Sequence, residues 1–105
     1  MYKLGIDLGG TNIAAGIVSD GGDILYKYNE KTDTASERTV IDSLAKAVSS
    51  LMKTSGIGSD LIETLGVACP GTVNGELGTV EYSANLPLLD TRVSSILAES
   101  TGIDA

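Results

Sequence analysis

Histidine, tryptophan and phenylalanine are absent from this chain of 105 residues, and cysteine occurs only once, at Cys69. Without an imidazole the chain can form no Ser-His or Cys-His catalytic pair, and zinc sites built from cysteine and histidine are excluded. A lone cysteine cannot form an internal disulfide, which is typical of a cytoplasmic protein. Because no basic residue lies close to it in the sequence, we expect Cys69 to be a small buried apolar side chain and not a nucleophile.

Positive charge is also scarce, because Lys and Arg total 7 against 14 Asp and Glu, which gives a net charge of −7. Such a chain lacks the basic surface that binds DNA or RNA and the basic stripe that binds an anionic membrane. No apolar run reaches membrane-spanning length, and the N-terminus has no signal-peptide core. Hydrophobic residues make up 42% and charged residues 20%, which is typical of one small globular domain.

The first third of the chain has the period of β-strands. Residues 2–8 alternate between apolar and other side chains, residues 13–19 are nearly all apolar and small, and residues 24–31 are rich in Ile, Leu and Tyr. The middle segment is typical of a strand covered on both faces. With a turn at Asp20-Gly21, the three segments predict an antiparallel meander.

The period then changes to that of a helix. Over residues 34–53 the apolar positions recur every three or four residues and share one face: Val40, Ile41, Leu44, Val48, Leu51 and Met52. A capping box is expected in "TASE", from Thr34 to Glu37, and either Gly56 or Gly58 ends the helix. A strand at 62–69 follows. Because a helix separates it from the meander, we expect it to lie parallel to a strand of the meander.

The last third is rich in glycine and proline. Asn74-Gly75 could turn a short hairpin, and Asp90 could cap a second helix that ends near Gly102. The resulting order, β-β-β-α-β-loop-α, is that of an α/β domain that stops before its next parallel strand. We therefore expect a truncated domain in which strand 62–69 has an unpaired edge that is open to self-association.

The stretch "DLGGTN", residues 7–12, joins the first two strands with more polar residues than a plain turn needs. Its glycines leave backbone N–H groups unobstructed, and successive N–H groups in such a turn form a concavity that suits a phosphate. Thr11 and Asn12 add side-chain donors. Asp7 repels phosphate, but it can hold Mg²⁺, directly or through water, and the metal then bridges to the phosphates. The other interpretation is an ordinary hairpin with a solvated aspartate, because short glycine motifs match many unrelated loops.

A second candidate region, "GVACPGTVNGELGTVEYSANLP", covers residues 66–87. It begins where a strand ends, and ligands of open α/β folds lie at the carboxyl ends of strands. Its neutral hydrogen-bonding side chains suit hydroxyl-rich ligands such as sugars: Thr72, Asn74, Ser83 and Asn85. Taken alone, the region is more typical of an ordinary loop of turn-forming residues than of a binding site.

Together the two regions resemble the N-terminal lobe of the ROK family (repressor, open reading frame, kinase), which includes bacterial glucokinases. The resemblance rests on "GIDLGGTNIAAGIVSDGGDIL" and "LGVACPGTVNGELGTVEYSANLP" and covers essentially the whole chain. It implies an α/β, ribonuclease H-like (actin-like ATPase) fold with a mixed sheet. On this basis residues 1–105 are the N-terminal lobe of a sugar kinase, incomplete and without the second lobe.

The resemblance also implies roles for individual residues. The first turn would bind the phosphates of ATP through Gly9, Gly10, Thr11 and Asn12, and the Mg²⁺ ligand would be Asp7. The Pro-Gly loop and the Asn-Leu-Pro stretch would line the sugar side of the cleft through Gly71, Thr72, Ala84 and Asn85. The general base of the family, an aspartate in an Asn-Asp pair, would lie beyond Ala105, so no catalytic residue is expected in this chain. Structural zinc belongs to the absent second lobe.

The resemblance implies a parent enzyme that transfers the γ-phosphoryl group of ATP to a hexose hydroxyl, as a cytoplasmic homodimer, while the fragment itself is inactive. ATP and the sugar are the expected partners, without nucleic acid or membrane. Three alternatives stay open: the sugar-sensing lobe of a ROK-type transcriptional repressor, another actin-like ATPase, and a small-ligand-binding module. "NLPLLD" lacks the tryptophan often found after Asn-Leu-Pro in relatives, so the identity of the sugar stays open too.

Overall fold

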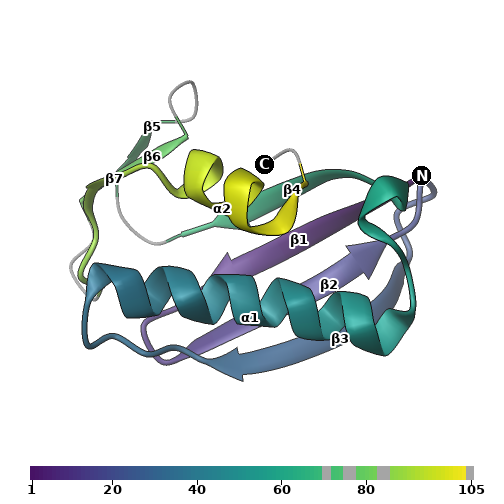
Figure 1. Ribbon diagram of the computed structural model, residues 1–105, viewed down its shortest axis with the longest axis horizontal. Coiled ribbons are helices and arrows are strands. Elements are labelled where there is room, and N and C mark those ends of the chain that lie inside the picture. Colours follow the sequence, from purple (N-terminus) through teal and green to yellow (C-terminus); the bar gives the residue numbers. More distant parts are fainter. Residues whose placement is uncertain (70–71, 75–77, 83–85, 104–105) are drawn as a thin grey trace.

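The main sheet contains four strands in the order β3-β2-β1-β4, in a computed structural model that describes residues 1–69, 72–74, 78–82 and 86–103. The strands are β1 (Tyr2–Leu8), β2 (Asn12–Val18), β3 (Ile24–Lys31) and β4 (Ile62–Ala68). β1, β2 and β3 pair antiparallel, whereas β4 lies parallel to β1 (Figure 1). The predicted meander and the parallel fourth strand are therefore confirmed.

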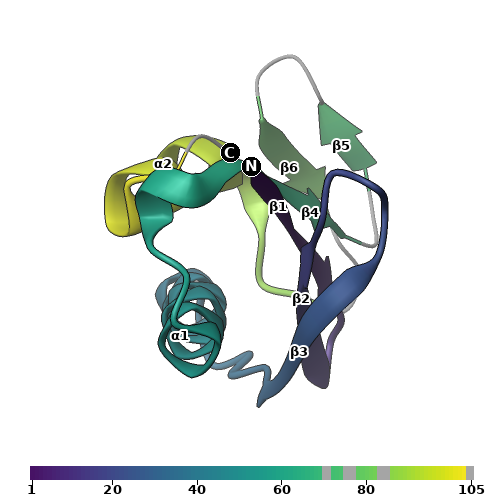
Figure 2. The same ribbon diagram turned by 90° about the vertical axis from the view of Figure 1, so that its right-hand side faces the viewer.

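One face of this sheet carries the core. Successive side chains leave a strand on opposite faces, so the alternation in β1 and β2 places one set of apolar residues together: Leu4, Ile6, Leu8, Ile13, Ala15 and Ile17. Both helices lie on that side (Figure 2). Within the described residues no element covers the other face, so the expectation that β2 is covered on both faces is wrong there. Glycine at position 16 of β2 has a local reason, because a Cβ there would lie only 3.3 Å from the Tyr26 carbonyl oxygen of β3.

The helix α1 (Glu37–Ser55) packs on β2 and β3 with the apolar face that its spacing predicts. Its capping box differs from the expected one. The Ser36 hydroxyl accepts a hydrogen bond from the Thr39 N–H at 3.1 Å, and Thr39 Oγ1 accepts one from the Ser36 N–H at 2.9 Å. The box expected from Thr34 to Glu37 is therefore wrong, because Glu37 is already the first helical residue.

The connection from α1 to β4 begins at Gly56. Its φ of 73° places it in the left-handed conformation that ends many helices, so the expected glycine cap is confirmed and is Gly56. A short 3₁₀ turn, η1 (Ser59–Leu61), then leads into β4. Within the described residues β4 forms one edge of the sheet, as expected. Self-association through that edge stays a prediction.

A second sheet follows, with β5 (Thr72–Asn74), β6 (Thr79–Tyr82) and β7 (Leu89–Thr91) in the order β5-β6-β7. β5 and β6 pair antiparallel, in agreement with a hairpin that begins at Asn74. Residues 75–77, which include the predicted turn residue Gly75, lie outside the described part of the chain.

The second helix, α2 (Val93–Thr101), begins after Arg92 and has no side-chain hydrogen bond at its cap. Asp90 is not the cap, contrary to expectation, because β7 pairs with β6 and so includes Asp90 in a strand. The end of the helix agrees with the sequence, since Gly102 caps it with a φ of 73°.

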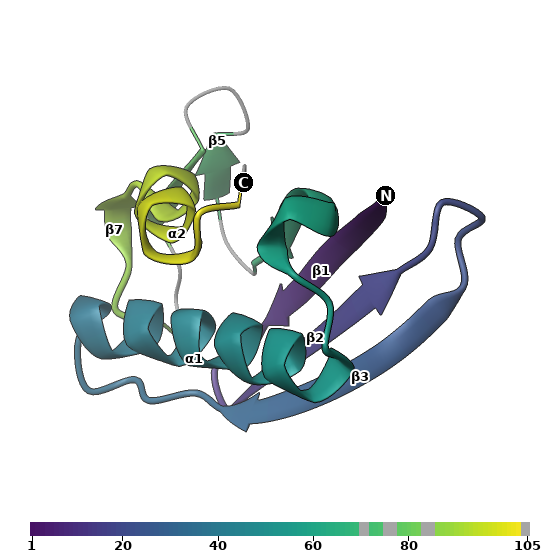
Figure 3. The same ribbon diagram turned by 45° about the vertical axis from the view of Figure 1, so that its right-hand side comes forward.

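A shared hydrophobic core joins these parts. α1 packs against α2 as well as the main sheet, and Figure 3 shows α2 between α1 and the second sheet. Fully buried side chains at the centre include Leu44, Leu51 and Leu97. A hydrogen bond of 2.9 Å from the Thr91 hydroxyl to a Glu37 carboxylate oxygen also ties β7 to the start of α1. No helix among the described residues has the length and apolar character needed to cross a membrane.

Candidate functional site

The turn between β1 and β2 is tight. The Gly9 N–H donates to the Asn12 carbonyl oxygen at 3.0 Å, which leaves Gly10 and Thr11 as the two residues of the turn. A Cβ at Gly9 would lie only 3.0 Å from that same oxygen. Glycine is therefore needed at Gly9 because the two ends of the turn approach each other closely, and not because the backbone is left-handed.

Two amide groups of the turn are free. Within the described residues the N–H groups of Gly10 and Thr11 donate no hydrogen bond, whereas the Gly9 N–H is used inside the turn. Thr11 and Asn12 are exposed, and Gly10 is half-buried. The turn therefore presents unused donors at the surface, where a ligand can reach them.

Asp7 lies on the open face of the sheet, opposite Ala14 on β2 and Ala68 on β4. Its side chain is exposed, and in the described part of the chain it forms no ion pair. A shallow hollow of about 470 Å³ on this face is lined by Gly5, Ile6, Asp7, Ala14, Ala15, Gly16, Val18, Ile24, Lys27 and Asn29. Its floor of small residues leaves the Asp7 carboxylate accessible to a ligand or a metal ion.

Residues of β3 and its C-terminal end contribute to the site, and sequence analysis did not single them out. Lys27 and Asn29 line the hollow, and their spacing of two on a strand was the signal that could have found them. Thr32 donates from its hydroxyl to the Gly9 carbonyl oxygen at 2.9 Å and from its N–H to the Thr11 carbonyl oxygen at 3.1 Å. No pattern in the sequence indicates these two contacts.

The predicted sugar-side residues are described only in part. Gly71, Ala84 and Asn85 lie outside the described residues. Thr72 is the first residue of β5 and pairs with Tyr82, and its side chain is outside the description. The structure therefore brings together Asp7 and the first turn, while the sugar-side assignments stay predictions.

Cys69 packs against the hydrophobic core just after β4. Burial raises the pKa of its thiol above the ordinary value, which disfavours the thiolate. This agrees with the expectation that it is not an activated nucleophile. Among the described residues no group of three or more His, Cys, Asp and Glu side chains could hold a metal ion.

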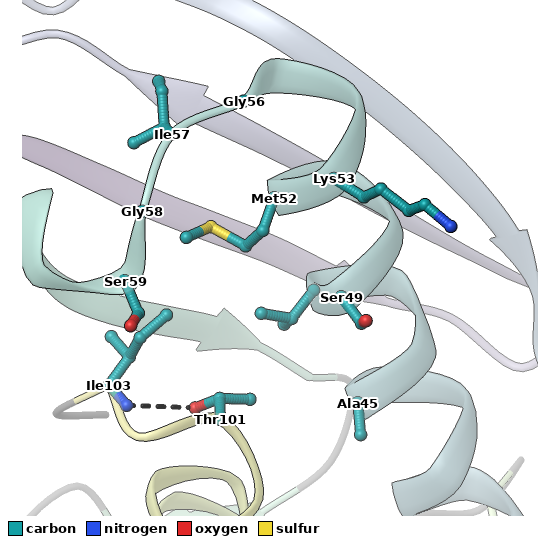
Figure 4. A pocket seen from close by; sticks show the side chains of 11 residues that line it. Ala45, Ser49, Met52, Lys53, Gly56, Ile57, Gly58, Ser59, Thr101 and Ile103 are labelled. Carbon is teal, nitrogen blue, oxygen red and sulfur yellow. Dashed lines mark hydrogen bonds between the residues drawn. The ribbon is translucent and has the colours of Figure 1, made fainter.

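A separate groove of about 490 Å³ lies between the C-terminal ends of α1 and α2. Figure 4 shows Met52, Ile57 and Ile103 around it, with Lys53 extending away from them. None of the residues predicted to bind ATP, Mg²⁺ or sugar lines this groove. It is therefore separate from the candidate site on the main sheet.

Comparison with known proteins agrees with this picture. The model of the ROK family matches residues 3–105. The glucokinase of Streptomyces coelicolor is 34% identical over 83 residues, which make up 79% of this chain and 24% of that protein. The chain thus spans about a quarter of the length of this curated relative.

Solved structures share the fold. The ROK hexokinase from Thermus thermophilus matches with a TM-score of 0.84 and 33% identity, over 98% of this chain and 33% of that one. A ROK family glucokinase from Streptomyces griseus, solved in complex with glucose and AMPPNP, matches with a TM-score of 0.86 and 25% identity, over 98% of this chain and 31% of that one.

A ROK family transcriptional regulator has the same fold, with a TM-score of 0.86 at 18% identity over 97% of this chain and 26% of that one. These likenesses identify the mixed four-stranded sheet with its helices as the actin-like fold that the sequence implied. Because the family model and the curated relative agree over most of the sequence, the chain belongs to the ROK family.

Proposed function

We propose that residues 1–105 form the N-terminal, phosphate-binding lobe of an ATP-dependent sugar kinase. The observation that carries the proposal is the pairing of a free carboxylate, Asp7, with free N–H groups at Gly10 and Thr11 in the adjoining turn. Relatives named glucokinase and hexokinase support it, as does the glucokinase solved with glucose and AMPPNP. The reaction is transfer of the γ-phosphoryl group of ATP to a sugar hydroxyl.

In this proposal the turn donates hydrogen bonds to phosphate oxygens through the N–H groups of Gly10 and Thr11, with the Thr11 and Asn12 side chains as further donors. Phosphoryl transfer needs mainly positioning and charge neutralisation from the protein. Asp7 suits Mg²⁺, which keeps several waters and takes one or two carboxylates besides the phosphates. When bound, the ion neutralises charge on the phosphates, and Asp7 keeps it beside the turn.

The remaining parts of the proposal concern the longer protein. Gly71, Thr72, Ala84 and Asn85 contact the sugar, and the general base and any structural zinc come from outside residues 1–105. The isolated chain then binds nucleotide without turnover. We propose that the longer protein is a homodimer in the cytoplasm. The single cysteine of this chain is compatible with a reducing compartment.

The main alternative is the sugar-sensing lobe of a transcriptional repressor, because a regulator of the same family has this fold. One feature favours the kinase. A sugar sensor has no need of an unpaired carboxylate beside a turn with free N–H groups.

The test is calorimetric titration of the 105-residue protein with AMPPNP, with and without Mg²⁺, in the wild type and in Asp7→Asn. We expect Mg²⁺ to strengthen binding to the wild type. Asp7→Asn should weaken Mg²⁺-dependent binding by about tenfold or more, since loss of even an outer-shell partner lowers metal affinity about 10–100-fold. Binding without Mg²⁺ should be unchanged or slightly tighter, because a carboxylate repels phosphate.

Asp23→Asn is the matched control, because Asp23 is an exposed aspartate in the β2–β3 turn at the opposite end of these strands. It makes the same change in net charge and should leave nucleotide binding unchanged. Equal behaviour of the two variants, or no binding of AMPPNP by the wild type, would contradict the proposal.

A further inference from the structure

We infer that Thr32 is a positioning residue that sets the direction in which the β1–β2 turn presents its N–H groups to phosphate. The inference rests on the proposed function, because it assigns the turn a phosphate ligand. Its basis is that one residue bonds to two carbonyl groups of the turn region, those of Gly9 and Thr11. The Thr32 hydroxyl donates to the Gly9 carbonyl oxygen at 2.9 Å, and the Thr32 N–H donates to the Thr11 carbonyl oxygen at 3.1 Å.

These two bonds determine the orientation of two peptide planes. A trans peptide is planar, and its N–H points opposite to its C=O. No cis peptide occurs among the described residues. With the Gly9 carbonyl turned toward Thr32, the Gly10 N–H in the same peptide points away from Thr32. The Thr11 carbonyl is held likewise, so the Asn12 N–H also points away from the β3–α1 connection.

Thr32 itself is held firmly. It is 6% exposed, and the next residue is anchored on α1. The Asp33 N–H donates to the Ser43 hydroxyl at 3.2 Å, and the Thr39 hydroxyl donates to the Asp33 carbonyl oxygen at 2.9 Å. A continuous set of hydrogen bonds therefore runs from the first turns of α1 to the β1–β2 turn. The turn is braced by the helix and not by its own sequence alone.

The side-chain bond is the part that mutation can remove selectively. Valine has the shape of threonine but lacks the hydroxyl, so Thr32→Val would leave the Gly9 carbonyl without this donor while the Thr32 main-chain bond stays. Serine keeps the hydroxyl, so Thr32→Ser should restore the bond. Thr101→Val is the matched control, because the Thr101 hydroxyl donates to the Leu97 carbonyl oxygen at 2.6 Å at the end of α2.

Binding of AMPPNP with Mg²⁺ to the 105-residue protein is the first readout. We expect Thr32→Val to raise the Kd about three- to tenfold, the range that corresponds to one net hydrogen bond. Thr32→Ser should stay within about twofold of the wild type, and Thr101→Val should bind as the wild type does. An equal loss in Thr101→Val, or no loss in Thr32→Val, would overturn the inference.

Amide NMR of the protein without nucleotide is the second readout, and it does not depend on binding. In Thr32→Val the Gly10 amide resonance should shift or broaden, and in Thr32→Ser and Thr101→Val it should keep its wild-type position. If the wild type binds no AMPPNP, the proposed function fails, and the Gly10 resonance alone decides whether Thr32 orients the turn. An unchanged Gly10 resonance in Thr32→Val would refute that orientation.

Discussion

At the scale of single residues, the chemistry of the site depends on groups left unused by folding. Asp7 forms no ion pair among the described residues, and the Gly10 and Thr11 N–H groups have no acceptor there. These groups lie at the surface, where water can satisfy them, so folding leaves them available to a ligand. Thr32 orients the Gly10 N–H through its hydrogen bond to the Gly9 carbonyl oxygen, so a structural bond there has a functional consequence.

Cys69 gives a prediction at the same scale. Burial raises the pKa of its thiol in the folded protein, so the protonated thiol persists to a higher pH there than in the unfolded chain. The stabilisation linked to this thiol is present below the unfolded pKa and is lost as the pH rises through the folded one. Alkylation by iodoacetamide needs the thiolate. The midpoint pH at which the labelling rate rises should therefore be higher in the native protein than in the protein unfolded in urea.

The control for this measurement is the same protein in denaturing urea, where the thiol is solvated. A midpoint of the rate against pH that is equal in the two states, or lower in the native state, would show that the thiol is not desolvated.

At the scale of elements, α1 links the connection that follows β3 to the second sheet. Its first turns hold Asp33, next to the Thr32 that braces the β1–β2 turn, and its Glu37 accepts a hydrogen bond from Thr91 on β7. The start of α1 is therefore in contact with both sheets. Its capping box must keep that end of the helix in place, because an uncapped helix leaves its first N–H groups without acceptors.

The cap can be tested by mutation. Ser36→Ala should lower the free energy of unfolding by about 1 kcal/mol, the usual cost of losing an N-cap side chain. Thr34→Ala should change it little, because the structure gives no capping role to Thr34. Urea unfolding followed by circular dichroism measures both. A larger loss in Thr34→Ala than in Ser36→Ala would restore the box that the sequence suggested.

At the scale of the whole molecule, one core holds both sheets and both helices. Leu44 is fully buried on α1, and residues of both sheets and α2 belong to the same cluster. A cavity made there should lower the stability of the whole described structure, since close-packed interiors relax only in part around a lost side chain. The stability of both sheets and both helices then depends on this core.

Leu44→Ala tests this dependence. It should lower the free energy of unfolding by about 2–5 kcal/mol through lost burial and a residual cavity. Leu61→Ala is the control, because Leu61 is 46% exposed, and a change within about 0.5 kcal/mol is expected. Thermal or urea unfolding measures both. Similar losses in the two variants would contradict the core described here.

Local patterns in the sequence were enough for most of the elements. The strands of the meander, the apolar face of α1 and the caps at Gly56 and Gly102 each depend on residues that are near one another in the chain. Asp7 and the glycine turn could also be singled out as a candidate site, since both lie within residues 7–12, and their roles stay predictions. Such features can be predicted from the order of residues in the sequence, because they depend on a short-range period or on local backbone geometry.

Other features depend on contacts between residues that are distant in the chain. β7 exists because it pairs with β6, which overrides Asp90 as a cap. The open face of β2 follows from the placement of both helices on one side of the sheet. Thr32 contacts Gly9, which lies 23 positions earlier in the chain, and no periodic pattern in the sequence predicts that contact. Local residue patterns are enough to predict which segments form strands and helices, whereas the packing of distant segments fixes which polar groups of the first turn are left without an acceptor among the described residues, because both partners of such a contact meet only in the folded chain.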